Sequence, residues 1–213
     1  MYEKFYERLE ELGIVPVVVL EKVEDAAPMA HALMHAGMES AEVTFRTACA
    51  AECIAAMRTA EPDMCVGAGT VLDNDQVDRA IAAGAQFIVS PGYSEDVVAH
   101  CIELDVPVLP GCVTPSDITA AIEHGLHVTK FFPAAQYGGL STIKALAAPF
   151  VGHRFMPTGG VSTANVEEYL SCPSIAACGG TWMVKPALFA DGDFSRVEAA
   201  AREAMDVVRK VRG

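Results

Sequence analysis

The chain has 213 residues, of which 52% are hydrophobic, and its formal net charge is −13. This length suits one domain over residues 1–213, and nucleic-acid binding is disfavoured because it normally needs a basic face. No apolar run approaches the roughly 18 residues of a membrane span. The acidic start "MYEKFYERLEEL" is unlike a secretory signal. We therefore expect a cytoplasmic protein with neither a membrane nor a nucleic-acid partner.

Short β-branched runs alternate with Ala-rich stretches of helical length. After a predicted helix at 3–12, the expected strands are 14–20, 41–45, 64–67, 86–90, 106–109, 127–132, 154–157 and 175–178. The expected helices are 25–36, 48–60, 74–83, 95–104, 115–124, 140–148, 163–170 and 194–210. Strands that alternate with helices predict parallel βαβ units. Eight units predict an α/β fold, a single-domain (β/α)8 TIM barrel with an extra N-terminal helix; a doubly wound sheet is the alternative.

Local signals mark several of the expected helix boundaries. Thr114-Pro115 and Ser162-Thr163 have residue types that cap helix starts, and proline is favoured in a first turn. Gly37, Gly84 and Gly125 each follow a helical run, as glycines that end helices do. These signals support the predicted alternation.

Glycine-rich segments follow several expected strands, where a barrel has its active site. "PTGG" at 157–160 and "CGGT" at 178–181 end the last two expected strands. Their glycines, including Gly179, leave backbone amides free to hold a phosphate, although a Gly pair is also ordinary turn chemistry. "GAGT" at 67–70 lacks the third glycine of a dinucleotide-binding fingerprint. We therefore expect loops that approach a ligand closely, without a nucleotide cofactor.

Lys130 lies in an apolar, strand-like run, "HVTKFFPA". Burial of an unpaired ammonium group is expensive, so a desolvated lysine favours its free amine. A free amine attacks a ketone to give a Schiff base, whose protonated form draws electrons from the neighbouring carbon–carbon bond. The alternative is a structural lysine, either ion-paired to Glu42 or with its ammonium at the barrel rim.

Polar residues alternate with apolar ones in "AEVTFR", which contains Glu42, Thr44 and Arg46. A period of two places these side chains on one side of a strand. If that side faces the barrel interior, Glu42 lies deep and Arg46 lies near the mouth. A carboxylate beside an imine-forming lysine can relay protons, and a guanidinium can bind a planar carboxylate with two hydrogen bonds. A structural salt bridge and a surface charge are the respective alternatives.

The cysteines and histidines form no recognised metal-binding or disulfide pattern. The seven cysteines, at 49, 53, 65, 101, 112, 172 and 178, include no Cys-x-x-Cys. Cys49 and Cys53 are four residues apart, so we expect them on one helix face. We expect the cysteines to be buried or inert thiols, with a redox role as the alternative. His31 and His35 lie in "HALMH", which lacks the glutamate of a zinc-binding HExxH motif. We expect the side chains of these histidines to face solvent or to pack against a neighbouring helix, and we expect no metal site.

Several segments resemble the 2-keto-3-deoxy-6-phosphogluconate (KDPG) aldolases, also called 4-hydroxy-2-oxoglutarate aldolases. They are "VPVVVLEKVEDAAPMAHAL", "AEVTFRT", "VGAGTVL", "GAQFIVSPG", "VPVLPGCVTPSD", "VTKFFPA", "FMPTGGVS" and "GGTWMV". These segments span nearly the whole chain in the family's order, and "EVTFRT", "GAGTVL", "FIVSPG" and "KFFPA" together are highly specific.

The resemblance implies a class I aldolase that needs neither a metal nor another cofactor, is built as a (β/α)8 barrel and commonly forms a homotrimer. By motif position, Lys130 would form the Schiff base and Glu42 would shuttle protons. Arg46, Thr70 and the backbone near Pro91 would bind the pyruvate carboxylate. Phe132 would pack beside the imine. The phosphate would be bound by Gly159, Gly160, Gly180 and Thr181.

Two positions depart from the family pattern. Ala135 stands where family members often have glutamate, and Thr181 stands where serine is frequent. Thr181 keeps the hydroxyl group, so this change is mild. Ala135 bears on how the polar tail of the substrate is held, and not on the imine chemistry.

The expected reaction is cleavage of 2-dehydro-3-deoxy-6-phosphogluconate to pyruvate and glyceraldehyde 3-phosphate. A further candidate substrate is 4-hydroxy-2-oxoglutarate, which would give pyruvate and glyoxylate. Three alternatives stay open: a 2-dehydro-3-deoxy-6-phosphogalactonate aldolase, a barrel isomerase that uses Glu42 without a covalent step, and a non-catalytic barrel that binds a ligand.

Overall fold

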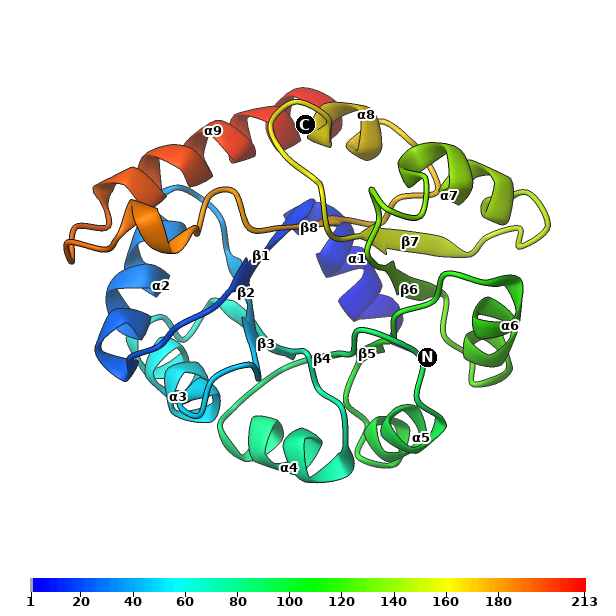
Figure 1. The fold of residues 1–213 in the computed structure, drawn as a ribbon, viewed down its shortest axis with the longest axis horizontal. Helices are drawn as coiled ribbons and strands as arrows, with labels where there is room; N and C mark the ends of the chain where they lie inside the picture. Colours follow the sequence, from blue (N-terminus) through cyan, green and yellow to red (C-terminus); the bar gives the residue numbers. More distant parts are fainter. Residues whose placement is uncertain (1) are drawn as a thin grey trace.

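Strands and helices alternate along residues 2–213, the part of the chain that this computed structural model describes. The strands curl around a common axis, and helices surround them (Figure 1). The strands are β1 (Ile14–Val18), β2 (Ser40–Thr44), β3 (Cys65–Gly69), β4 (Ile88–Val89), β5 (Val108–Leu109), β6 (Val128–Phe131), β7 (Arg154–Pro157) and β8 (Cys178–Gly180). The helices are α1 (Glu3–Leu12), α2 (Ala26–His35), α3 (Ala50–Ala60), α4 (Asn74–Ala82), α5 (Glu95–Glu103), α6 (Pro115–Glu123), α7 (Gly139–Ala147), α8 (Val166–Leu170) and α9 (Ser195–Arg212), with short 3-10 helices η1 (Val23–Asp25) and η2 (Pro186–Leu188).

All paired strands are parallel, which confirms the predicted βαβ alternation. One sheet has the order β5-β4-β3-β2-β1-β8, and a second contains β6 and β7. The first order lacks the reversal beside β1 that a doubly wound sheet has. Isolated bridges link the two sheets, Gly111 with Lys130 on one side and Thr158 with Gly179 on the other.

The expected continuous eight-stranded ladder is therefore found only in part. β4 and β5 have two residues each, where the sequence predicted strands of four or five. Prolines flank β5, because Pro107 precedes this strand and Pro110 follows it. Proline cannot donate a ladder hydrogen bond, so the hydrogen-bonded part of this strand is short. Only one bridge then remains between β5 and β6.

The predicted helix starts were right at one position and wrong at the other. Thr114 caps α6, because its Oγ1 accepts a hydrogen bond from the Asp117 amide at 3.2 Å while the Asp117 carboxylate accepts one from the Thr114 amide. Ser162 does not cap α8, which begins only at Val166. Ser162 Oγ instead accepts a bond from the Ala164 amide, and this local turn delays the helix.

Apolar side chains form two layers. A large cluster lies between the strands and the surrounding helices and includes Ala41 and Val43 of β2. Because side chains alternate along a strand, the neighbouring Ser40, Glu42 and Thr44 face the interior of the curled sheet. A second cluster fills that interior with Tyr6, Leu9, Val15, Phe87, Val89, Leu109, Val128, Met156, Ala176 and Ala177.

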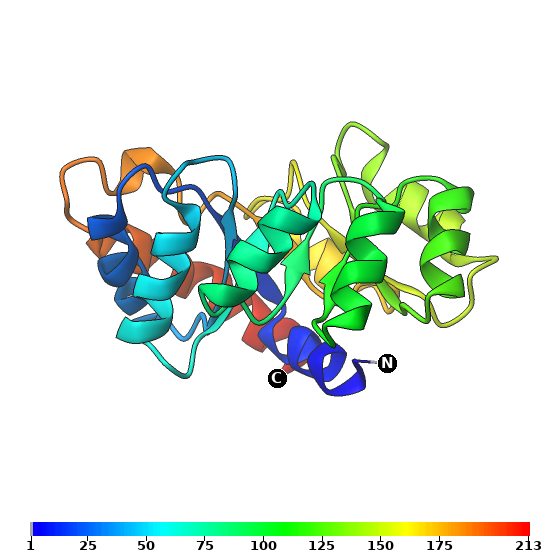
Figure 2. The same ribbon diagram turned by 90° about the horizontal axis from the view of Figure 1, so that it is seen from below.

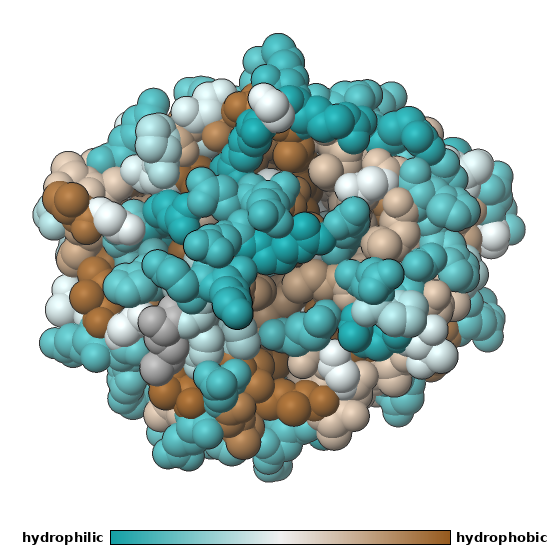
Figure 3. All heavy atoms as spheres, turned by 180° about the vertical axis from the view of Figure 1, so that it is seen from behind, coloured by the Kyte–Doolittle hydropathy of each residue, from teal (hydrophilic) through white to brown (hydrophobic). Residues whose placement is uncertain are grey.

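Helix α1 closes one end of the interior. Its Tyr6 and Leu9 are buried in the inner cluster. α1 and the C-terminal end of the chain lie at this end of the molecule, opposite the loops that follow the strands (Figure 2). Figure 3 shows the face of the molecule at this end, turned by 180° from the view of Figure 1. Hydrophilic side chains cover most of this face and surround smaller hydrophobic patches. The open end of the interior is therefore the one at the carboxyl ends of the strands.

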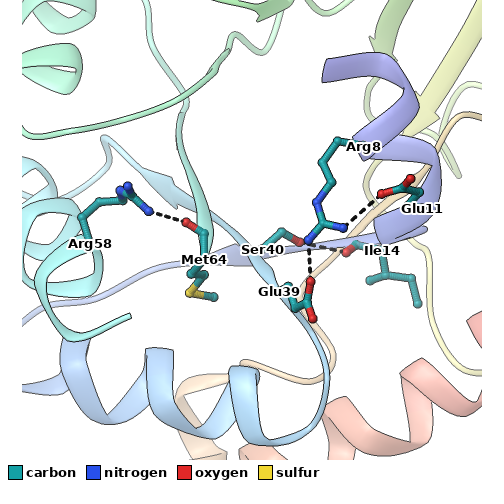
Figure 4. A network of polar contacts seen from close by, with 7 residues as sticks. All are labelled: Arg8, Glu11, Ile14, Glu39, Ser40, Arg58 and Met64. Carbon is teal, nitrogen blue, oxygen red and sulfur yellow. Dashed lines mark hydrogen bonds and ion pairs between the residues drawn. The ribbon is translucent and has the colours of Figure 1, made fainter. Parts of the chain in front are cut away.

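Polar contacts hold α1 against the amino ends of β1 and β2 (Figure 4). Arg8 pairs with Glu11 at 3.1 Å and with Glu39, which directly precedes β2. The hydroxyl of Ser40 donates a hydrogen bond to the carbonyl oxygen of Ile14 at 3.1 Å. These exposed ion pairs contribute little individually, about 0–1 kcal/mol each. They fix the register of α1 beneath the strands while its apolar face supplies most of the binding.

Other expectations concern the surface and the thiols. His31 and His35 are exposed on α2, as predicted, and His31 Nδ1 lies 2.6 Å from Glu61 Oε1. All seven cysteines are free thiols. Within residues 2–213, no helix combines the length and the apolar character needed to cross a membrane.

Candidate active site

Lys130 on β6 and Glu42 on β2 meet inside the curled sheet. The Lys130 Nζ lies 3.2 Å from Glu42 Oε1, and the side chains are 5% and 0% exposed. These strands are not neighbours in either sheet, so the contact crosses the interior. A buried charge is tolerated when it is paired and hydrogen-bonded, and each side chain supplies the partner of the other.

A glycine makes room for the Glu42 carboxylate. A Cβ atom at Gly69 of β3 would lie 2.1 Å from Glu42 Oε1. The other carboxylate oxygen, Oε2, and the buried hydroxyl of Thr44 have no hydrogen-bond partner within residues 2–213. Buried polar atoms are normally satisfied, so these two are free to accept or donate bonds to a substrate or a water molecule.

A cavity of about 210 Å³ opens at the carboxyl ends of the strands, beside the Lys130–Glu42 pair. Lys130 is one of its lining residues and is the one that connects it to Glu42. Its walls come from β1, β6, β8 and the segments that follow β2, β6, β7 and β8. The lining residues are Val17, Arg46, Lys130, Phe132, Thr158, Gly159, Gly160, Val161, Gly180 and Thr181.

Arg46 brings an exposed guanidinium to the cavity. Its Nε donates a hydrogen bond to Thr70 Oγ1 at 3.3 Å, which leaves the two terminal nitrogens for a ligand. Thr70 has a φ of 58°, a left-handed conformation that is unfavourable for a β-branched residue. Such backbone strain is typical of functional sites, because the surrounding structure holds the residue in place for its side chain.

The opposite wall of the cavity consists largely of backbone. Gly159 and Gly160 have φ values of 92° and 81°, which residues with a Cβ rarely adopt. A Cβ at Gly180 would lie 1.9 Å from Cζ3 of Trp182. These glycines let peptide groups reach the cavity surface, and Thr181 adds a hydroxyl. Backbone amides in such turns form anion-binding concavities.

Phe132 and Thr158 flank the lysine. The ammonium of Lys130 lies 5.3 Å from the ring centroid of Phe132, within the range of a cation–π contact. Thr158 is 5% exposed, and its hydroxyl has no hydrogen-bond partner in the described part of the chain. Gly179 is not a lining residue; it packs against Thr158, since a Cβ there would lie 2.2 Å from Thr158 Oγ1.

The structure brings together most of the residues singled out from the sequence; besides Glu42, which meets the cavity through Lys130, two are placed indirectly. Thr70 reaches the cavity through Arg46. Pro91 is outside the lining, and its carbonyl oxygen packs against Gly111, which is bridged to Lys130. Pro91 therefore supports the strand of the lysine and does not contact the cavity itself.

Three lining residues were missed by the sequence reasoning: Val17, Thr158 and Val161. Thr158 lies within the "PTGG" segment, in which only the glycines were considered as ligand contacts. Its hydroxyl group could have identified it as a further candidate. Val17 is an apolar strand residue that nothing in its type distinguishes from the core. Its position beside Glu42 in the register of β1 and β2 identifies it only once the strands are paired.

A larger cavity, of about 630 Å³, lies at the opposite end between α1, α8 and α9. Its lining includes Leu170, Met205, Val208 and Arg212. The Arg212 guanidinium is engaged there by backbone, since it donates hydrogen bonds to the carbonyl oxygens of Ile175 and Ala176 and of Glu10. The buried acid–base pair belongs to the smaller cavity, and size alone does not identify the reactive site.

Comparison with known families matches residues 5–200 to a family described as KDPG and KHG aldolase. The chain belongs to the KDPG and KHG aldolase family. A relative in this family, the 2-dehydro-3-deoxy-phosphogluconate aldolase of Treponema pallidum, is 49% identical over 203 residues, which cover 95% of this chain and 97% of that protein.

Solved structures of KDPG aldolases have the same fold. The enzyme of Zymomonas mobilis, determined with 3-phosphoglycerate, is 39% identical with a TM-score of 0.88, over 96% of this chain and 95% of the other. The enzyme of Legionella pneumophila, with pyruvate captured as a covalent carbinolamine, is 33% identical with a TM-score of 0.89, over 92% of this chain and 96% of the other. The α/β fold of this chain is thus that of the KDPG and KHG aldolases.

Proposed function

We propose that this chain is a class I aldolase that cleaves 2-dehydro-3-deoxy-6-phosphogluconate to pyruvate and glyceraldehyde 3-phosphate. The observation that carries the proposal is the buried Lys130, paired with Glu42 at 3.2 Å at the edge of a ligand-sized cavity. The covalent carbinolamine of pyruvate in the Legionella relative supports amine chemistry of this kind. As a second substrate we propose 4-hydroxy-2-oxoglutarate, which the family description includes.

The two sides of the cavity fit the two ends of this substrate. Arg46 offers free guanidinium nitrogens, which bind a 2-keto acid carboxylate well because of their planar geometry. The wall with Gly159, Gly160, Gly180 and Thr181 would hold the phosphate through amides and a hydroxyl. The Zymomonas relative, determined with 3-phosphoglycerate, supports a phosphorylated ligand. Lys130 lies in the same cavity, where the C2 ketone would be presented to it.

The first half of the reaction forms the iminium ion. Glu42 takes a proton from the Lys130 ammonium across their contact, and the free amine attacks the C2 carbonyl carbon. Glu42 then returns protons to the carbinolamine oxygen, which leaves as water. The positive iminium nitrogen lies beside the face of Phe132, whose π-electrons favour a cation there.

The second half breaks the carbon–carbon bond. Glu42, directly or through a water molecule, takes the proton of the C4 hydroxyl, and the C3–C4 electron pair moves into the iminium to give an enamine. The C4 fragment leaves as glyceraldehyde 3-phosphate. Protonation at C3 and hydrolysis of the imine then release pyruvate and restore Lys130. The unpaired Glu42 Oε2 and Thr44 hydroxyl provide places for the water that this cycle consumes and releases.

We also propose that the eight strands close into a barrel that forms one domain over residues 1–213. The bridges at Gly111–Lys130 and Thr158–Gly179, on the two sides of the β6–β7 pair, support closure. A homotrimer in the cytoplasm that needs no cofactor is proposed from the motif resemblance alone. Sedimentation of the purified protein tests the trimer.

Reduction of the imine tests the function. Protein incubated with pyruvate and treated with borohydride should carry a reduced pyruvate adduct on the Lys130 peptide. Lys144→Ala, at an exposed lysine, is the matched control and should keep the adduct, whereas Lys130→Ala should lose it. A non-covalent isomerase and a non-catalytic binding protein both predict no adduct. Rates with the 6-phosphogluconate, 6-phosphogalactonate and 4-hydroxy-2-oxoglutarate substrates then rank the aldolase alternatives.

A further inference from the structure

Two thiols that the proposed reaction does not use lie in contact at the start of α3. Cys49 Sγ is 3.8 Å from Cys53 Sγ. Cys49 is half-buried and Cys53 is buried, and both are free thiols. A backbone carbonyl oxygen lies beside each sulfur: Cys49 Sγ lies 3.4 Å from that of Leu20, and Cys53 Sγ lies 3.8 Å from that of Lys22. The pair therefore forms a small dithiol site that is reached through Cys49.

We propose that Cys49 and Cys53 bind neutral trivalent arsenic compounds as a dithiol site. Trivalent arsenic is pyramidal, so two bonds of about 2.3 Å, the length of a zinc–thiolate bond, would span a little less than the sulfur–sulfur contact of 3.8 Å, and the sulfurs need to approach each other only slightly. A direct disulfide would need the sulfurs about 2.05 Å apart and the two Cβ atoms within about 4.5 Å. The amide of Cys53 donates a helical bond to the carbonyl of Cys49 at 2.9 Å, and this turn would have to open. The geometry thus favours the one-atom bridge.

The same site is poorly suited to a metal ion. Structural zinc takes four donors, and no group of three or more His, Cys, Asp or Glu side chains comes together in the chain from residue 2 onward. Metal binding also requires thiolates, whereas burial, with a hydrogen bond to Cys49, raises the pKa of the Cys53 thiol to about 12. A buried thiol whose pKa is raised instead suits a neutral reagent that binds two sulfurs and carries one further substituent.

The binding step is a condensation without oxidation or reduction. An arsenic(III) oxide, R–As=O, forms one As–S bond with each thiol and loses its As=O bond. The two thiol protons leave with that oxygen as one water molecule, and arsenic stays trivalent. Because Cys49 is the half-buried thiol, it reacts first, and Cys53 closes the ring from 3.8 Å away. The substituent R then points to the exposed side of Cys49.

The site adjoins the segment that carries Arg46. Residues 45–49 connect β2 to α3, and Thr47 Oγ1 lies 3.8 Å from Cys49 Sγ. An adduct on Cys49 would displace this contact and shift Arg46 from its bond to Thr70. This consequence rests on the proposed function, and we expect the KM for the 2-keto acid to rise at least about fivefold with kcat changed by less than about twofold.

Phenylarsine oxide tests the site. Reduced protein should gain one phenylarsenic group per chain by intact mass, and the adduct should survive excess monothiol and be removed by a dithiol. Cys49→Ser and Cys53→Ser should each lose the monothiol-resistant adduct. Cys101→Ser, which removes a buried single thiol on α5, is the matched control and should retain it. Cys49 is half-buried, so its variant remains informative if Cys53→Ser does not fold.

Two results would overturn the site: wild-type protein without a monothiol-resistant adduct, or an adduct that persists in Cys49→Ser. An adduct without a change in KM would overturn only the coupling to Arg46. Borohydride trapping of pyruvate, carried out on untreated and on arsenic-treated protein, separates these outcomes from a failure of the aldolase proposal. If Lys130 forms the imine in untreated protein, the proposed function stands whatever the arsenic result.

Discussion

The ammonium nitrogen of Lys130 lies 3.2 Å from Oε1 of Glu42, although the two residues are 88 positions apart in the chain. Both side chains are buried, so each removes the penalty of leaving the other charge alone in the interior. Loss of one partner of a buried pair typically costs about 3–5 kcal/mol. The pair is therefore a structural contact as well as the proposed proton-transfer route, and variants have to separate these two roles.

Glu42→Gln keeps the size and one hydrogen-bond acceptor but removes the base. We expect kcat to fall by about 10²–10⁴, the usual contribution of general acid–base catalysis. Borohydride should still trap pyruvate on Lys130, but slowly. Thermal unfolding measured in parallel shows how much of the loss is structural. A kcat within a factor of two of wild type would contradict the proton-shuttle role.

Gly69→Ala tests the placement of the carboxylate without altering it chemically. The new Cβ would meet Glu42 Oε1 at 2.1 Å, so the side chain must move away from Lys130. We expect kcat to fall at least about tenfold, because small displacements of a catalytic group are costly. Gly92→Ala is the matched control, since no atom lies within 4 Å of a Cβ there, and its steady-state rate should be unchanged. Equal rates for both variants would refute the steric argument.

Thr70→Asn should separate backbone strain from ligand binding. Asparagine tolerates the left-handed conformation found at a φ of 58° better than threonine does, so unfolding should become harder by up to about 1 kcal/mol. The hydroxyl that accepts the Arg46 hydrogen bond is lost, so Arg46 is held less firmly and the KM for the 2-keto acid substrates should rise. Urea unfolding and steady-state kinetics measure the two effects. Lower stability with an unchanged KM would contradict both parts.

His153 should make the fold sensitive to acid. It is 5% exposed, its Nε2 lies 2.9 Å from Thr129 Oγ1, and burial, with a smaller contribution from His127, lowers its pKa to about 4. The unfolded state, with a pKa near 6.5, therefore binds the proton first as pH falls. The free energy of unfolding should drop by about 2 kcal/mol between pH 7 and pH 5 from this residue.

The control for this prediction is His153→Gln, which keeps a hydrogen-bonding group but does not titrate. For each protein, the free energy of unfolding at pH 5 is compared with that of the same protein at pH 7, because the substitution itself perturbs the core. Urea unfolding at pH 7 and pH 5 should then show a smaller drop in the variant than in the wild type. An equal drop would assign the acid sensitivity to other groups.

Ala135→Glu should strengthen binding of the phosphorylated substrate selectively. Ala135 is exposed, and its Cβ lies close to Gly160 on the proposed phosphate side of the cavity. A carboxylate there, as family members often have, can accept hydrogen bonds from hydroxyl groups in the polar tail of the substrate, so the KM for 2-dehydro-3-deoxy-6-phosphogluconate should fall several-fold. The KM for 4-hydroxy-2-oxoglutarate, which lacks this tail, should change less. An equal change for both substrates would show that the loop itself had moved.

The alternation of strands and helices was predictable because hydrophobic periodicity is a local property of the chain. The bounds of α1 and β7 agree with the expected 3–12 and 154–157. The short β4 and β5 were not predicted, since ladder pairing depends on the neighbouring strand as well as on residue type. The delayed start of α8 arises from a turn at Ser162 that competes with the capping geometry read from the sequence.

The candidate site likewise combines residues that could be predicted from the sequence with features that only the structure shows. Lys130 could be singled out by its apolar setting, and Glu42 with Arg46 by their alternation in one short run. Thr158 lay within a quoted segment, yet only the tertiary structure shows that this residue lines the cavity and that its hydroxyl is buried without a partner in the described part of the chain. The spacing of Cys49 and Cys53 predicted one helix face for both, but the contact between their sulfurs was shown only by the structure.

The amino-acid sequence by itself determined the parallel βα repeat, the unusual lysine in a strand and the motifs of an aldolase family. Only the tertiary structure decided that this lysine meets Glu42, that Gly69 makes room for the carboxylate and that Pro91 stands behind the cavity wall. The physical reason is range. Periodicity and turn chemistry act between neighbours in the chain, whereas a contact across the interior depends on how far the whole sheet curls.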